Sequence, residues 1–71
     1  MNDNPLQTLD RRGALRCVRF ASGEVGVVNA RGRTVLTVGA VQRLAFADHG
    51  FLRGDNGRTF FVDMKNGAIY A

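Results

Sequence analysis

The chain contains one seven-residue pattern twice, at residues 23–29 and 57–63. The two copies begin 34 positions apart, and each begins with a glycine that follows a turn-forming Ser or Asn. Each copy also ends just before a second glycine turn, which contains Gly32 in the first copy and Gly67 in the second. A repeat of this length with turns at both ends indicates one supersecondary unit, here a β-hairpin, that is used twice.

The length and composition indicate a small globular protein. The chain has 71 residues, which is enough for one domain, and 45% of them are hydrophobic. A core of this size is near the lower limit of independent stability, so we expect further burial in an oligomer or against a partner, unless the sheet closes on itself. We expect a polar N-terminal tail over residues 1–13 and a single all-β domain over 14–71, with repeat units at about 14–38 and 47–71.

Hydrophobic runs between turn signals predict six or seven short antiparallel strands in a meander. The dipeptides at residues 22–23 and 56–57, Ser-Gly and Asn-Gly, predict two-residue hairpin loops. The first of these loops would place Phe20 opposite Val25. Gly32 fits the left-handed position of a three-residue loop. The expected fold is therefore an all-β curved sheet or small barrel built from two hairpin repeats.

Residues 40–49 fit two kinds of local structure. Val41, Leu44 and Ala45 fall at helical spacing, which would place them on one face of a helix. Leu44 and Phe46, however, alternate with less apolar neighbours, as in a short strand. We favour an extended conformation because the repeat continues through this stretch.

The shared pattern, Gly-x-hydrophobic-x-x-hydrophobic-Asn/Asp followed by a glycine turn, resembles the WG repeat. That bacterial hairpin unit has the signature Gly-Lys-Trp-Gly-Tyr-Ile-Asp-x-x-Gly-Lys. Residues 25–26 and 59–60 stand at its Trp-Gly position, although the chain contains no tryptophan, and residues 46–50 resemble the segment that joins successive units. The resemblance covers residues 13–71 and implies a β-rich repeat that serves as a binding scaffold and has no catalytic residues.

Few side chains suit catalysis or metal binding. Cys17 is the only cysteine, so an internal disulfide is excluded, and its apolar surroundings predict an inert core thiol. His49 is the only histidine and has no recognisable catalytic or metal-binding partner in the sequence. We therefore expect no enzyme activity, no catalytic residues, no cofactor and no metal. The start of the chain lacks the features of a signal peptide and no run is long enough to cross a membrane, so we expect a cytoplasmic protein without membrane contact.

The charge of the chain is basic and is carried mostly by arginine. Ten basic residues against six acidic ones give a formal net charge of +4. A basic surface attracts nucleic acid, although the coding bias of the source would also explain the arginines. Arginines beside aromatic side chains on a sheet can bind a protein or a single-stranded nucleic acid. The candidate binding residues are Arg19, Arg33, Arg43, Phe51, Arg53, Arg58 and Phe60.

The function that the sequence favours is a non-enzymatic protein-interaction module that presents a sheet face or edge. Strands at residues 14–21 or 68–70 would be edge strands, which could pair with a second copy in a homodimer. The small size also suggests a phage or mobile-element accessory protein that inhibits a host factor by binding it. The alternative is a basic nucleic-acid-binding β domain that uses the arginines and aromatics on one sheet face.

Overall fold

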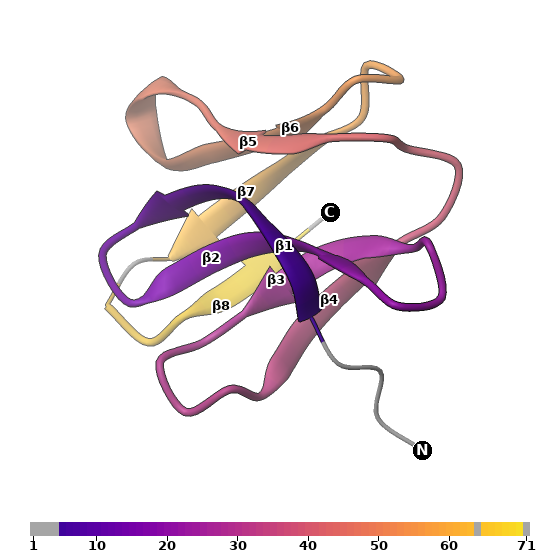
Figure 1. The fold of residues 1–71 in the computed structure, drawn as a ribbon. Helices are drawn as coiled ribbons and strands as arrows, with labels where there is room; N and C mark the ends of the chain where they lie inside the picture. Colours follow the sequence, from indigo (N-terminus) through magenta and orange to yellow (C-terminus); the bar gives the residue numbers. More distant parts are fainter. Residues whose placement is uncertain (1–4, 64, 71) are drawn as a thin grey trace.

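The computed structural model describes residues 5–63 and 65–70, which form two four-stranded antiparallel sheets (Figure 1). The first sheet contains, in order, β1 (Pro5–Arg12), β2 (Leu15–Phe20), β3 (Val25–Val28) and β4 (Thr34–Val38). The second sheet contains, in order, β5 (Leu44–Phe46), β6 (Phe51–Gly54), β7 (Thr59–Asp63) and β8 (Ala68–Tyr70). The predicted all-β class is confirmed, with eight strands in this part of the chain rather than six or seven, and neither sheet closes into a barrel.

The two sheets repeat one design. Strands β2, β3 and β4 of the first sheet correspond, 34 positions later, to β6, β7 and β8 of the second. The repeated segments 23–29 and 57–63 each contain the end of a hairpin turn and the strand that follows it. One hairpin unit is therefore used twice, as the repeat predicts.

The first hairpin turn is one residue longer than the predicted two-residue loop. The backbone N–H of Phe20 donates to the carbonyl oxygen of Glu24 at 2.8 Å, and the N–H of Gly23 donates back to Phe20 at 2.9 Å. These bonds enclose a three-residue loop that ends at Gly23, whose φ of +92° suits glycine. Arg19 therefore lies opposite Val25, and the predicted Phe20–Val25 pairing was wrong by one residue.

The one-residue difference reverses the faces of β2. Side chains alternate along a strand, so a register shift of one residue turns every side chain of one strand to the other side of its partner. Val18 and Phe20 consequently face away from the side that Val25 and Val27 share. The three-residue loop predicted around Gly32 is confirmed. The backbone N–H of Gly32 donates to the carbonyl oxygen of Asn29, the residue before the loop, at 3.0 Å.

The expected polar tail differs from the structure over residues 5–12, which form β1. This strand turns back after Arg12 and pairs with β2 through two register shifts. This pairing satisfies backbone N–H and C=O groups of β2 that would otherwise be open. Residues 5–12 therefore form a strand although most of their side chains are polar. The expectation that residues 14–21 form an edge strand was therefore wrong, because β2 lies between β1 and β3. The expectation for residues 68–70 is confirmed, since β8 is the last strand of its sheet.

The ambiguous stretch at residues 40–49 contains a strand, as we favoured. Its three-residue strand β5 pairs with β6, and a short 3-10 turn, η1 (Asp48–Gly50), leads into β6. Val41 and Leu44 do not share a helix face. Val41 is buried from the loop before β5 and Leu44 from β5 itself, with 5% and 1% of their surfaces exposed.

The main core lies between the two sheets. Its buried members come from both repeats and from the loop before β5: Leu15, Cys17, Val25, Val27, Val38, Val41, Leu44, Leu52, Phe60 and Val62. A second, smaller cluster lies on the other side of the first sheet and consists of Val18, Phe20 and Val28. The central strands β2 and β3 of the first sheet are therefore buried on both faces, whereas the second sheet contributes one face to the core.

Two side chains of β1 join the first sheet to the open edge of β5. The carboxylate Oδ2 of Asp10 accepts the backbone N–H of Phe46 at 2.8 Å. The guanidinium of Arg12 donates to the carbonyl oxygen of Ala47 at 2.7 Å and lies 5.5 Å from the centre of the Phe46 ring. The side chains of Asp10 and Arg12 thus form hydrogen bonds with backbone groups at the edge of β5 that a neighbouring strand would otherwise bind.

Cys17 lies in the main core with none of its surface exposed, as predicted. Burial raises the pKa of its thiol from the ordinary 9.0 to about 12, and the charge of Asp10, its neighbour on β1, adds to the rise. Loss of the thiol proton would place a charge in this apolar space, so the folded chain keeps the thiol neutral.

The close approach of Phe20 to Gly26 predicts a clear difference between two glycines. A Cβ at Gly26 would collide with the carbonyl oxygen of Leu36 and come within 2.8 Å of the Phe20 ring. We expect Gly26→Ala to lower the free energy of unfolding by about 3 kcal/mol in urea titrations. Gly39→Ala, where a Cβ meets nothing within 4 Å, is the control and should change it by less than about 1 kcal/mol. Equal effects would contradict the packing described for β3.

The raised pKa of Cys17 predicts a loss of stability in alkali. The unfolded thiol, with its ordinary pKa of 9.0, releases its proton near pH 9.0, while the folded thiol, with a pKa of about 12, keeps it to higher pH. Between these values the unfolded state binds fewer protons, so the free energy of unfolding falls as pH rises, by up to about 1.4 kcal/mol per pH unit. Cys17→Ala should lack this contribution in urea titrations from pH 8 to about pH 11. The same slope in both proteins would refute the role of the thiol.

Candidate binding face of the second sheet

The outer face of the second sheet carries a row of aromatic side chains. Phe51 on β6 lies opposite Phe61 on β7, and Phe61 in turn lies opposite Tyr70 on β8. Because cross-strand partners share a face, the three rings lie on one side of the sheet. We call this side the aromatic face and define it by Phe51, Arg53, Thr59, Phe61, Asp63 and Tyr70.

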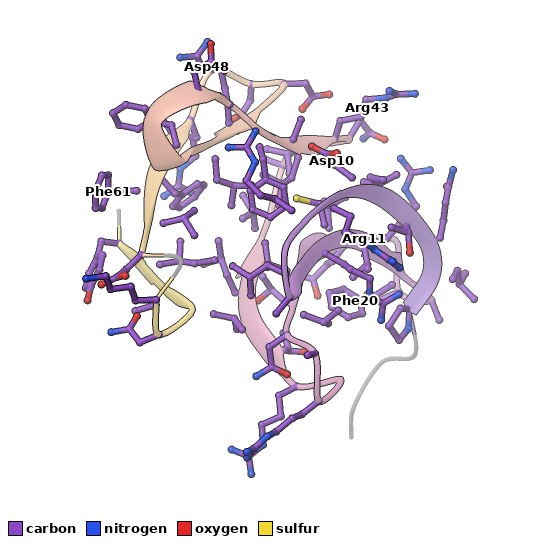
Figure 2. All side chains as sticks on the ribbon, turned by 90° about the vertical axis from the view of Figure 1, so that its left-hand side faces the viewer. Asp10, Arg11, Phe20, Arg43, Asp48 and Phe61 are labelled. Carbon is purple, nitrogen blue, oxygen red and sulfur yellow. The ribbon has the colours of Figure 1, made fainter. Side chains whose placement is uncertain are left out.

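The three rings of the aromatic face are accessible to solvent. The exposed fractions of Phe51, Phe61 and Tyr70 are 38%, 48% and 52%. The Phe51 and Phe61 rings meet edge to face, with their centres 5.9 Å apart and their planes at 74°. Figure 2 shows Phe61 pointing away from the body of the protein. Large aromatic side chains that are adjacent and exposed form a patch suited to contact with another molecule.

Two opposite charges flank the aromatic row. Arg53 lies on β6 opposite Thr59, on one side of the row. Asp63 lies on β7 opposite Ala68, on the other side, and its Oδ1 accepts the backbone N–H of Lys65 at 3.0 Å. The face is therefore positive at one end, apolar in the middle and negative at the other end.

The repeat shows what covers the corresponding face of the first sheet. Phe51 and Phe61 stand 34 positions after Cys17 and Val27. Cys17 and Val27 have no exposed surface, and they belong to the core that the second sheet closes. The aromatic face is thus the counterpart of a face that is covered by a sheet in the first repeat.

The hairpin register changes the predicted set of binding residues. The second hairpin also has a three-residue loop, because the N–H of Gly54 donates to the carbonyl of Arg58 at 2.8 Å. Leu52 therefore lies opposite Phe60, whereas the predicted two-residue loop at residues 56–57 would place Arg53 there, so that prediction was wrong by one residue. Phe60 is buried with 4% of its surface exposed, and the Arg58 guanidinium lies 5.2 Å from its ring centre.

The other arginines of the predicted set lie on different parts of the molecule. The guanidinium of Arg19 donates to the backbone carbonyl of Gln42 at 2.7 Å, so it links β2 to the loop before β5. Arg43 lies in the same loop and is exposed. Arg33 follows the loop between β3 and β4 and is also exposed. Of the predicted residues, the structure brings together Phe51 and Arg53 on the aromatic face.

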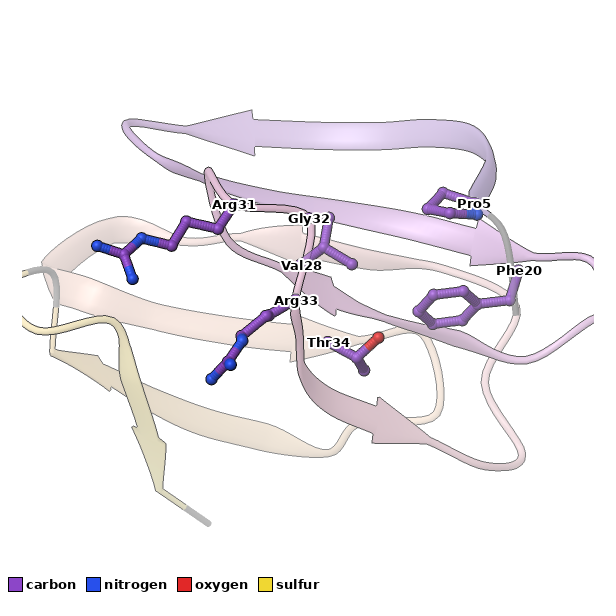
Figure 3. Close-up of a pocket in the computed structure, with 7 residues that line it drawn as sticks. All are labelled: Pro5, Phe20, Val28, Arg31, Gly32, Arg33 and Thr34. Atoms are coloured by element: carbon purple, nitrogen blue, oxygen red, sulfur yellow. The ribbon is translucent and has the colours of Figure 1, made fainter. Parts of the chain in front are cut away.

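Arg33 lines an open hollow beside the first sheet (Figure 3). The volume of this hollow is about 460 Å³, and its walls are Pro5, Phe20, Val28, Arg31, Gly32, Arg33 and Thr34. The Asn29 side chain orders the loop between β3 and β4, because its Oδ1 accepts hydrogen bonds from the backbone N–H groups of Arg31 and Arg33 at 2.9 and 3.0 Å. In Figure 3 the two arginine side chains point away from Phe20. The basic groups and the buried ring are therefore not combined into one stacking surface.

Phe61 and Tyr70 are members of the face that the sequence reasoning missed. Both follow from the hairpin register, because a three-residue loop at residues 55–57 places Phe61 opposite Phe51, whereas a two-residue loop would turn Phe60 to that face instead. The signal was available in the chain, since glycine at the third loop position fits a three-residue loop as well as a two-residue one.

Comparisons with known proteins give no family for the chain. Searches against protein families, curated proteins and solved structures find no match. The resemblance to the WG repeat therefore stays a prediction. Within residues 5–63 and 65–70, no three His, Cys, Asp or Glu side chains are grouped so that they could hold a metal ion. The same residues contain no helix long and apolar enough to span a membrane.

The opposite environments of two neighbouring phenylalanines give a test of this register. Phe60→Ala should lower the free energy of unfolding by about 3–5 kcal/mol, because it opens a cavity in the core. Phe61→Thr retains a residue that suits a strand and loses one edge-to-face contact, so it should cost less than about 1.5 kcal/mol. Urea titrations of the two variants measure both values. A greater loss for Phe61→Thr would show that the two faces are assigned the wrong way round.

Proposed function

We propose that the chain is a non-enzymatic protein-interaction module that binds another protein chain through its aromatic face. The observation that carries this proposal is the unequal covering of equivalent faces in the two repeats. Cys17 and Val27 are buried under a packed sheet, while Phe51 and Phe61 are exposed at the same positions of the second unit. A partner that covers the second face would complete the packing that the first face already has.

The composition of the aromatic face supports a protein as the partner. Aromatic residues and arginine are enriched at protein interfaces, where a few such side chains supply most of the binding energy. Phe51, Phe61 and Tyr70 supply broad apolar surfaces on rigid strands, so little conformational freedom is lost on binding. Arg53 and Asp63 on either side can direct the orientation of the partner.

A second candidate function is binding of single-stranded nucleic acid. It is favoured by Arg53, which lies beside the aromatic row, because rings on a sheet can stack bases while an arginine neutralises a phosphate. Asp63 on the same face repels phosphate, and Arg19, Arg33 and Arg43 lie elsewhere. These charges make a protein the stronger proposal.

Capture from an extract of the source cells tests the proposed function. The immobilised chain should retain a specific protein, or an untagged copy of itself, that the variant carrying Phe51→Thr and Phe61→Thr does not retain. We expect at least about a tenfold loss, since interface aromatics commonly contribute 2 kcal/mol or more. Quantitative mass spectrometry of the retained proteins provides the measurement.

Leu6→Thr is the matched control for this capture. Leu6 is 70% exposed on β1, so the variant also removes an exposed hydrophobic side chain, but from the first sheet. Retention that survives Leu6→Thr and is lost with the double variant supports the aromatic face. If the double variant retains the same proteins as the original chain, the proposal is refuted. Binding of a single-stranded oligonucleotide that weakens steeply with salt would instead favour the second candidate.

A further inference from the structure

The charges on the aromatic face are arranged so that the face is complementary to itself. Arg53 lies one row from the line of rings on one side, and Asp63 lies one row from it on the other side. If two copies meet face to face, a two-fold axis along the row of rings turns one end of the face onto the other. Arg53 of each copy then lies across from the end of the face that carries Asp63 in the other copy.

The two-fold axis along the rings is the one that the charges allow. A two-fold axis along the strands would instead place Arg53 against the arginine end of the second copy and Asp63 against its aspartate end. Like charges in contact across an interface are unfavourable. With the favourable axis, Arg53 and Asp63 of the other copy are offset sideways by one strand spacing, about 4.8 Å, which an arginine side chain can span.

We propose that the chain forms a face-to-face homodimer in which the aromatic rows of two copies pack together and Arg53 of each copy pairs with Asp63 of the other. The inference rests on the proposed function, because it names a second copy as the protein that covers the aromatic face. It differs from pairing through edge strands, since side chains of a sheet face form the contact.

The first sheet does not offer a competing surface for stacking. The face of β2 and β3 that would continue a head-to-tail array carries Val18, Phe20 and Val28. These side chains are between 0% and 2% exposed, so they are already buried within their own chain. A head-to-tail contact would form open chains of molecules, whereas a contact of one face with itself closes after two copies.

The size of the face indicates a weak dimer. A standard protein interface buries roughly 800 Å² per partner. The total accessible surface is 4736 Å², so an interface of that size would take about one-sixth of the molecule. The aromatic face is defined by six residues on three short strands, fewer than the roughly 20–30 residues that each partner contributes to a standard interface, so we expect a reversible dimer whose population rises with protein concentration.

Analytical ultracentrifugation of the whole chain over a range of concentrations tests the dimer. We expect Arg53→Glu and Asp63→Lys each to raise the dimer Kd by about tenfold, because each variant places like charges across the interface. An equimolar mixture of the two variants, and the double variant R53E/D63K, should return to within about threefold of the original Kd, since both restore opposite charges.

Two further variants separate pairing from net charge and from loop stability. Arg43→Glu and Glu24→Lys make the same changes in net charge at exposed sites outside the face and should leave the Kd unchanged. Asp63→Asn keeps an oxygen that can accept the Lys65 N–H, so it tests the loss of the charge alone. Thermal melting of each variant verifies that it is folded.

A wild-type chain that stays monomeric at every concentration would overturn the homodimer. A dimer that is unaffected by Phe61→Thr, or that charge exchange does not restore, would also overturn it. Face-dependent capture of a different protein by a chain that does not self-associate would leave the proposed function intact while refuting this inference. Loss of both self-association and face-dependent capture would refute both.

Discussion

The hydrogen bonds that close the two hairpin turns decide which side of each strand is buried. In both repeats a three-residue loop ends at a glycine with positive φ, Gly23 or Gly57. This loop sets the register, and the register sends Val25 and Val27 into the core. The same register leaves Phe61 on the outside. A loop shorter by one residue would reverse the faces of the strands that it joins.

An exchange of a ring and a glycine accompanies the different packing of the two repeats. Phe20 and Gly26 in the first unit correspond, 34 positions later, to Gly54 and Phe60. In the first sheet the Phe20 ring lies against Gly26, on the face opposite the main core. In the second sheet Phe60 lies in the main core. The two sheets therefore contribute non-equivalent faces to the main core: the first sheet contributes the face of Val27, and the second contributes the face of Phe60. The face of the second sheet that is equivalent to that of Val27 is the aromatic face, which stays uncovered.

The parts of the fold that depend on local chemistry were predictable from the sequence. Glycine turns and alternating apolar residues predict β3, β4, β7 and β8. Loop length was not predictable in this way, because Ser-Gly and Asn-Gly fit loops of two or three residues, and the choice depends on which face the whole sheet buries. The β1 strand was missed because its residues are polar and it gains its stability by pairing with β2.

The candidate site was predictable only where it does not depend on register. Phe51 and Arg53 both belong to the predicted set and lie on one face, since both alternate with the buried Leu52. Phe60 was named in place of Phe61 because the assumed loop was one residue short. Tyr70 was not named because its partner on β7 follows from the same register.

The side chains that cover the edge of β5 have a consequence for how this chain avoids misassembly. Asp10 binds the N–H of Phe46, and Arg12 binds the carbonyl of Ala47. A strand from another molecule would need these backbone groups to begin a fibril-like ladder, and both are occupied in the native state. Before β1 docks, these two backbone groups are open to pairing with another strand, so the docking of β1 is also what protects this edge from intermolecular pairing.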